Sequence, residues 1–206
     1  MPKARAGLVR WAGQAAVITG AALGVSASAT ADVRTSTQTQ SYSVGGTSAR
    51  TLVGYMRSNP FRGANGDAVA STRPSYALHI ASKQHGGTCR PSEVTLNINF
   101  VVTVPRARSA LEGSTQTAWN GFLAFARRHE DTHRRIYVEC GNAFVAKAER
   151  LSSSTCAGLD AAIRRLLESE KRLCDGRQRA FDRAEYGRVK GLALFKMAGG
   201  SSRASR

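Results

Sequence analysis

The sequence has few acidic residues, and after residue 31 it has no apolar run long enough to cross a bilayer. Fourteen Asp and Glu stand against 30 Lys and Arg, which gives a formal net charge of +16. The cations are spread over several segments and do not form a basic motif interleaved with aromatics, which argues against nucleic acid as a partner. They suit anionic polymers of a cell envelope, or simply a solvated surface.

The sequence also lacks a Cys-x-x-Cys pair and any internal repeat. Its four cysteines are Cys89, Cys140, Cys156 and Cys174. In an exported protein this even number favours two disulfide bonds over a cysteine metal site. Of the three pairings we favour Cys156 with Cys174 and Cys89 with Cys140. The first requires the chain to fold back, since a continuous helix would hold its ends far beyond disulfide reach.

Export is indicated by the first 31 residues. Lys3, Arg5 and Arg10 precede an Ala-rich apolar run over 12–25, and a small-residue Ala-x-Ala pattern follows it. This is the order of a secretory signal peptide cleaved before Asp32, because a membrane anchor would need about 20 apolar residues. We expect a secreted or periplasmic protein without a transmembrane span. Removing three cations from +16 leaves a net charge of +13.

The mature chain is long enough for one domain with a sizeable core, since 42% of the sequence is hydrophobic. Residues 32–41, rich in Thr, Ser and Gln, predict a flexible lead-in. Residues 42–195 predict a single domain, and residues 196–206 a disordered basic tail. The pattern along the domain is strands first and helices second, which predicts an α+β fold with an amino-terminal antiparallel sheet packed on a carboxy-terminal helical part.

The strand signals lie in the first half of the domain. Short strands are expected at 42–47 and 72–81, around a helix at 48–56. The clearest strand is 93–104, where apolar and polar residues alternate, and Pro105 is expected to end it. We therefore expect a half-buried antiparallel strand there.

Helical periodicity takes over in the second half. Apolar residues recur at three- and four-residue steps from Ser114 to about Arg150. A second helix is expected over 157–173. Asp175-Gly176 should then interrupt the helix before a third one over 178–194.

The long helix carries the string His129-Glu130-Asp131-Thr132-His133. At 100° per residue the two histidines lie one turn apart on one face, so their ring nitrogens can share a zinc ion. Glu130 then lies beside the metal, where its carboxylate can act as general base and later as general acid. The alternative is a pair of buried histidines bonded to the backbone. The apolar stripe that contains both histidines favours the metal site.

A zinc peptidase needs a third protein ligand and one open position. Glu170 lies in the apolar stripe of the 157–173 helix, where an unpaired carboxylate is costly. We take Glu170 as the candidate ligand; an ion pair with a basic residue is the alternative.

These features together resemble a bacterial domain-of-unknown-function family, number 922, described as predicted secreted zinc-dependent proteases. The resemblance is carried, in the family's order, by Tyr42-Ser43-Val44-Gly45-Gly46-Thr47, Leu52, Met56, Pro60, Cys89, Trp119 and the His129–His133 string. It implies a zincin-like fold, Zn²⁺ as cofactor and a peptide or protein substrate.

The family also carries an aromatic-Asp segment leading to a His-Gly near its carboxy end. Here the comparable stretch runs from Phe181-Asp182 to Tyr186-Gly187, and the histidine is absent. Tyr186 takes its place, and a tyrosine hydroxyl donates to an oxyanion more readily than it binds zinc. The resemblance thus implies a catalytic role for Tyr186, and Asp182, Glu185 and Tyr186 itself stand beside Glu170 as third-ligand alternatives.

Two functions follow from the sequence. The first is an exported zinc metallopeptidase with zinc on His129, His133 and one later residue, and Glu130 as the base. The second is a non-catalytic exported module on the same scaffold that binds anionic envelope polymers. Zinc content and the effect of replacing Glu130 separate the two.

Overall fold

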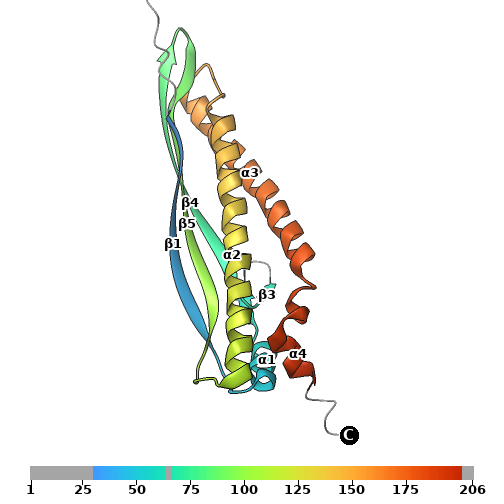
Figure 1. Cartoon of the computed structure of the whole chain (residues 1–206). Helices are drawn as coiled ribbons and strands as arrows, with labels where there is room; N and C mark the ends of the chain where they lie inside the picture. Colours follow the sequence, from blue (N-terminus) through green and yellow to red (C-terminus); the bar gives the residue numbers. More distant parts are fainter. Residues whose placement is uncertain (1–29, 64–65, 201–206) are drawn as a thin grey trace, which may run out of the picture.

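Three long strands form one sheet whose central member is β5 (Thr88–Ala107). β4 (Ser71–His85) pairs with it antiparallel, and β1 (Thr30–Val44) pairs with its other edge in parallel. The structure, a computed structural model, describes residues 30–63 and 66–200. Figure 1 shows this sheet along one side of the long helices. The α+β class is confirmed, with a mixed rather than a purely antiparallel sheet.

The expected flexible lead-in at 32–41 is wrong, because these residues form most of β1. They pair with β5 throughout, from Asp32 opposite Thr95 to Ser41 opposite Val104. The sequence of this segment shows no alternation of apolar and polar residues, and nearly all of its side chains are exposed. An edge strand needs only backbone partners on one side, so the strand forms without that signal. The predicted signal peptide lies outside the described residues except for its last two positions.

The β4–β5 hairpin turns on two glycines. Gly86 and Gly87 have φ of +51° and +82°, the left-handed backbone that a two-residue hairpin turn requires. At its far end β5 runs past Pro105, where a stop was expected, to Ala107. The pairing of β5 with β4 ends at Thr103, opposite Ser71, so β1 is the only described strand beside Pro105. With no strand on the β4 side, a proline without an N–H is tolerated there.

Two long helices cover the inner face of the sheet. α2 (Gly113–Ala148) has 36 residues, a length of about 54 Å, and α3 (Cys156–Glu185) runs back alongside it (Figure 1). The interruption expected at Asp175-Gly176 does not occur, and α3 is continuous there. A helical glycine costs about 1 kcal/mol, which packing against α2 outweighs. The expected helix over 178–194 is divided, since α3 ends at Glu185.

The shorter elements gather around the amino-terminal end of α2. α1 (Ala49–Ser58) begins at the capping residue Ser48, and the short strands β2 (Phe61–Gly63) and β3 (Gly66–Ala68) follow as a hairpin. The 3₁₀ turn η1 (Val189–Gly191) leads into α4 (Ala193–Gly200). The expected tail from residue 196 therefore begins inside a helix, and residues 201–206 lie outside the described chain.

Both expected cysteine pairings are wrong. The disulfides join Cys89 to Cys156 and Cys140 to Cys174. Cys156 and Cys174 lie on one continuous helix, about 27 Å apart along its axis, and cannot meet. Two disulfides fit an extracellular protein. In the part of the chain that the structure describes, no helix is long and apolar enough to span a membrane.

The core has two main apolar clusters along α2. One joins the inner face of β5 to the carboxy-terminal half of α2 and to α3, and the other joins α1, α4 and the start of α2. In the first cluster Gly141 lets α2 approach the sheet, since a Cβ there would lie 3.0 Å from Ile98 Cδ1. Between the two clusters, α2 lines a cavity with Ala126, His129, Glu130 and His133.

Candidate metal centre

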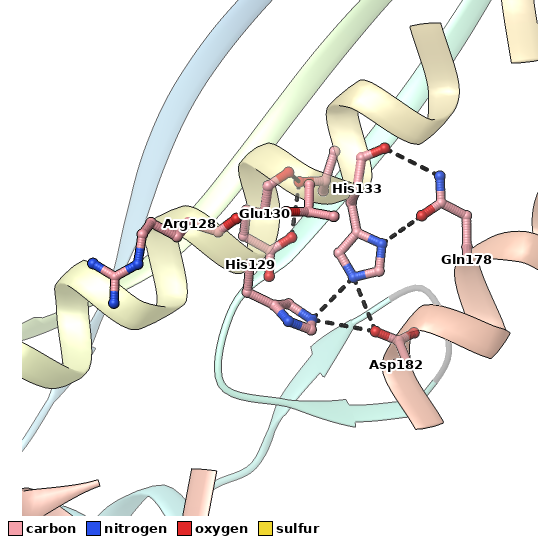
Figure 2. A network of polar contacts seen from close by, with 8 residues as sticks. Arg128, His129, Glu130, His133, Gln178 and Asp182 are labelled. Atoms are coloured by element: carbon pink, nitrogen blue, oxygen red, sulfur yellow. Dashed lines mark hydrogen bonds and ion pairs between the residues drawn. The ribbon is translucent and has the colours of Figure 1, made fainter. Parts of the chain in front are cut away.

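Two pairs of side chains, each spaced one helical turn apart, face each other across the α2–α3 contact. His129 and His133 project from α2, and Gln178 and Asp182 project from α3 (Figure 2). Helix pitch aligns each pair, because residues four apart share a face. The antiparallel course of the helices then brings the two faces together.

Three donor atoms converge at this contact. Asp182 Oδ1 lies 2.9 Å from His133 Nε2 and 3.2 Å from His129 Nε2, and the two Nε2 atoms are 3.0 Å apart (Figure 2). A tetrahedral zinc ion with bonds of about 2.0–2.1 Å holds its donor atoms about 3.3–3.4 Å apart. The three atoms fit such an ion after outward shifts of a few tenths of an ångström. Within the described residues, this is the group of His, Cys, Asp and Glu side chains that could hold a metal.

The electrostatics of the centre favour positive charge. Burial alone would raise the pKa of Asp182, but the hydrogen bonds to His129 and His133 outweigh it and hold that pKa well below its usual range. Burial alone would lower the pKa of His133, and the hydrogen bonds to Asp182 and Gln178 outweigh it and raise that pKa. A carboxylate between two imidazole nitrogens therefore suits a bound cation.

Glu130 lies beside the centre and is only 3% exposed. Thr72 on β4 donates its hydroxyl hydrogen to Glu130 Oε2 at 2.8 Å. Burial raises the pKa of Glu130, and the Thr72 hydrogen bond and the neighbouring histidines offset only part of that rise. The carboxylate, both histidines and Asp182 line one cavity of about 700 Å³.

The structure places Glu170 away from the histidines. Its carboxylate pairs with the Lys147 ammonium at 2.7 Å, and its side chain is 11% exposed. Glu170 lies 12 residues before Asp182 on α3, about 18 Å along the axis. Glu170 therefore forms the ion pair that was the alternative to metal binding, with a lysine of α2 as its partner. The carboxylate that lies against the two histidines is that of Asp182.

Tyr186 and Glu185 lie at the rim of the cavity. Tyr186 lines it but is 73% exposed, with the Lys190 ammonium 5.5 Å from its ring centroid. Glu185 also lines it and accepts a hydrogen bond from Arg188 at 2.7 Å. Neither belongs to the group that could hold a metal.

Sequence reasoning missed Gln178 and Thr72, and it named Phe181 only as the aromatic residue before Asp182, with no role of its own. Gln178 is a polar residue one turn after Cys174 on the apolar face of α3, a signal parallel to the one that singled out Glu170. The Phe181 ring stacks on His129 at 4.7 Å between centroids. Thr72 comes from a strand 58 residues earlier in the chain, and no local pattern marks it.

The fold and the centre together define an α+β protein in which a long helix presents a His-Glu-x-x-His string to an aspartate on a second helix. A family model described as "Bacterial protein of unknown function (DUF922)" matches residues 39–188, a range that includes every residue of the centre, and the chain belongs to this family. Comparisons with curated proteins and with solved structures gave no match.

Proposed function

We propose that this protein is an exported zinc-dependent peptidase. The observation that carries the proposal is the convergence of His129, His133 and Asp182 beside the buried carboxylate of Glu130. Two neutral imidazoles and one carboxylate are a ligand set that catalytic zinc uses, with the fourth position left for water. The two disulfides and the signal-like residues before Asp32 support export to the periplasm or the medium.

The proposed ligands would be the Nε2 atoms of His129 and His133 and one carboxylate oxygen of Asp182. When bound, zinc supplies a Lewis acid that polarises a carbonyl and lowers the pKa of water to about 7. Asp182 would neutralise part of the charge of the ion.

Glu130 would move the protons of the reaction. Thr72 holds Oε2 of its carboxylate, so Oε1 would take a proton from the attacking water and later deliver it to the leaving amine. Burial beside the cavity supports this role, because it raises the pKa of Glu130 towards the working pH of a base. The Thr72 bond would also limit rotation of the carboxylate.

The cavity supports a peptide substrate by its size and its lining. About 700 Å³ accommodates one or two side chains beside the scissile bond. Apolar residues from three different helices line it, namely Met56, Phe125 and Phe195. Tyr186, at the rim, would contact substrate rather than metal.

The test uses the processed protein purified from the periplasm or medium of an expressing cell. We expect about one zinc ion per chain and cleavage of an unfolded protein substrate. Glu130→Gln should keep the zinc and lose cleavage by about 10²-fold or more. Glu139→Gln is the matched control, since Glu139 is an exposed residue of the same helix paired with Arg177.

Two results would overturn the peptidase proposal. One is a processed protein that holds no zinc at micromolar concentrations of the metal. The other is a Glu130→Gln variant that cleaves as fast as the wild type. A protein without zinc or cleavage that is retained by an anionic polymer would be the non-catalytic binding module instead.

A further inference from the structure

Both polar atoms of the Gln178 side chain form hydrogen bonds with His133. It is 2% exposed, and its amide Nε2 donates to the backbone carbonyl oxygen of His133 at 3.1 Å. Its Oε1 meets His133 Nδ1 in a short hydrogen bond (Figure 2). Both ends of the amide therefore contact the same histidine from the opposite helix.

This double contact fixes the orientation of the amide. A carbonyl oxygen only accepts hydrogen bonds, so the group that faces the His133 carbonyl must be the NH₂ end of Gln178. A flipped amide would place its oxygen against the carbonyl oxygen of His133, two acceptors with no hydrogen between them. The atom of Gln178 that faces His133 Nδ1 is therefore Oε1. Since Oε1 also only accepts, Nδ1 of His133 must carry a hydrogen and donate it.

We propose that Gln178 is a positioning residue that holds the hydrogen of His133 on Nδ1, so that Nε2 presents its lone pair to the metal. This inference rests on the proposed zinc centre. A neutral imidazole has one hydrogen, for which Gln178 Oε1 at Nδ1 and Asp182 Oδ1 at Nε2 compete, and the nitrogen without the hydrogen is the one that can bind metal. The second hydrogen bond of Gln178, to the backbone carbonyl of the same residue, holds the amide in place, so its Oε1 stays in front of Nδ1.

The two histidines differ in this respect. His129 Nδ1 is buried without a hydrogen-bond partner among the described residues. Its ring is held by stacking, with Phe181 at 4.7 Å and Phe125 at 6.1 Å between centroids. Stacking sets a ring plane but does not choose between the two nitrogens. The polar partner of His129 is Asp182 Oδ1, 3.2 Å from Nε2, which is itself a proposed ligand, so the outer hydrogen bond that selects a nitrogen is the one between Gln178 and His133.

The experiment compares four zinc-free or zinc-titrated proteins: wild type, Gln178→Met, Gln178→Glu and Gln116→Leu. Methionine is similar in length to glutamine but cannot replace its hydrogen bonds, whereas glutamate keeps an acceptor for Nδ1 and loses the donor. Gln116 is the control because it is a partly exposed glutamine of α2, bonded to Asn120 and outside the metal centre. Nitrogen-15 NMR of the His133 ring, recorded where the ring is neutral, reports which nitrogen carries the hydrogen. Competition with a chelator gives zinc affinity.

We expect the Nδ1–H form in the wild type, in Gln178→Glu and in the control. Gln178→Met should lose that preference, because Asp182 Oδ1, 2.9 Å from Nε2, is then the acceptor that remains beside the ring. It should also bind zinc about 10–100-fold more weakly, the loss typical of removing a group that orients a metal-bound histidine. Gln178→Glu should stay within about tenfold of the wild-type affinity.

The inference is overturned if folded Gln178→Met keeps the Nδ1–H form or the wild-type zinc affinity. It is also overturned if folded Gln178→Glu loses the Nδ1–H form, a result that remains decisive should the Met variant fail to fold. Neither readout uses peptide cleavage. A wild type that shows the tautomer and binds zinc but cleaves nothing would sink the peptidase proposal and leave this inference standing.

Discussion

The Cys140–Cys174 disulfide lies in the same helix–helix contact as the metal centre, and its removal should loosen that centre. Cys174 precedes Gln178 by one turn and Asp182 by two, a distance of about 12 Å along α3. The other disulfide ties Cys156 at the start of α3, about 39 Å from Asp182 along the axis. The two bonds should therefore differ in their effect on zinc.

Their effects on stability should be similar. The disulfides close segments of 34 and 67 residues, for Cys140–Cys174 and Cys89–Cys156 respectively. The chain-entropy relation gives about 3.8 and about 4.4 kcal/mol of stabilisation at 25 °C. For a domain of this size each kcal/mol shifts Tm by about 2–4 °C, so each pair of Cys→Ser changes should lower Tm by about 8–18 °C.

The zinc affinities should separate the two variants. Without Cys140–Cys174, the end of α3 that carries Asp182 is held against α2 by noncovalent contacts alone, such as the hydrogen bonds of Gln178, and zinc binding should weaken by about tenfold or more. Without Cys89–Cys156 that end stays tied, and the affinity should remain within about threefold of wild type. Calorimetric unfolding and chelator competition on the same samples give both quantities. Equal losses of zinc affinity in the two variants, or none in either, would refute the reasoning.

Three further outcomes are expected. Asp182→Asn should weaken zinc binding by more than about 100-fold, the upper end of the loss when a residue that only orients a ligand is removed, whereas Glu170→Gln should leave the affinity unchanged. A zinc titration in which Glu170→Gln loses more affinity than Asp182→Asn would make Glu170 the ligand. Thr72→Val should lower stability by about 1.5–3 kcal/mol and slow cleavage while zinc content stays at the wild-type level, and unchanged turnover would remove Thr72 from the mechanism. Gly141→Val should overpack the α2–sheet contact and cost about 1–3 kcal/mol in thermal unfolding, against little for Gly121→Val, where an added Cβ meets nothing within 4 Å; equal costs would contradict this.

Much of the candidate site was predictable because it depends on the pitch of one helix. Any continuous helix through His129 and His133 places both rings on one face, and the apolar residues around them predicted such a helix over residues close to the observed span of α2. The alternation in 93–104 predicted the central strand for a similarly local reason, since one face of β5 is buried under the helices. Membership of the family followed from these same ordered motifs.

The amino-acid sequence by itself determined the long helix, the facing histidines with Glu130 between them, and the central strand, because each depends on neighbours within one or two turns or pleats. Only the tertiary structure decided which carboxylate meets the histidines and which cysteines pair. Glu170 and Asp182 lie on the same helix, and the choice between them depends on the register of α3 against α2. That register is held by the Cys140–Cys174 disulfide and by contacts such as Lys147–Glu170 and His129–Asp182, between residues 23 to 53 positions apart, and no local periodicity encodes contacts at that separation.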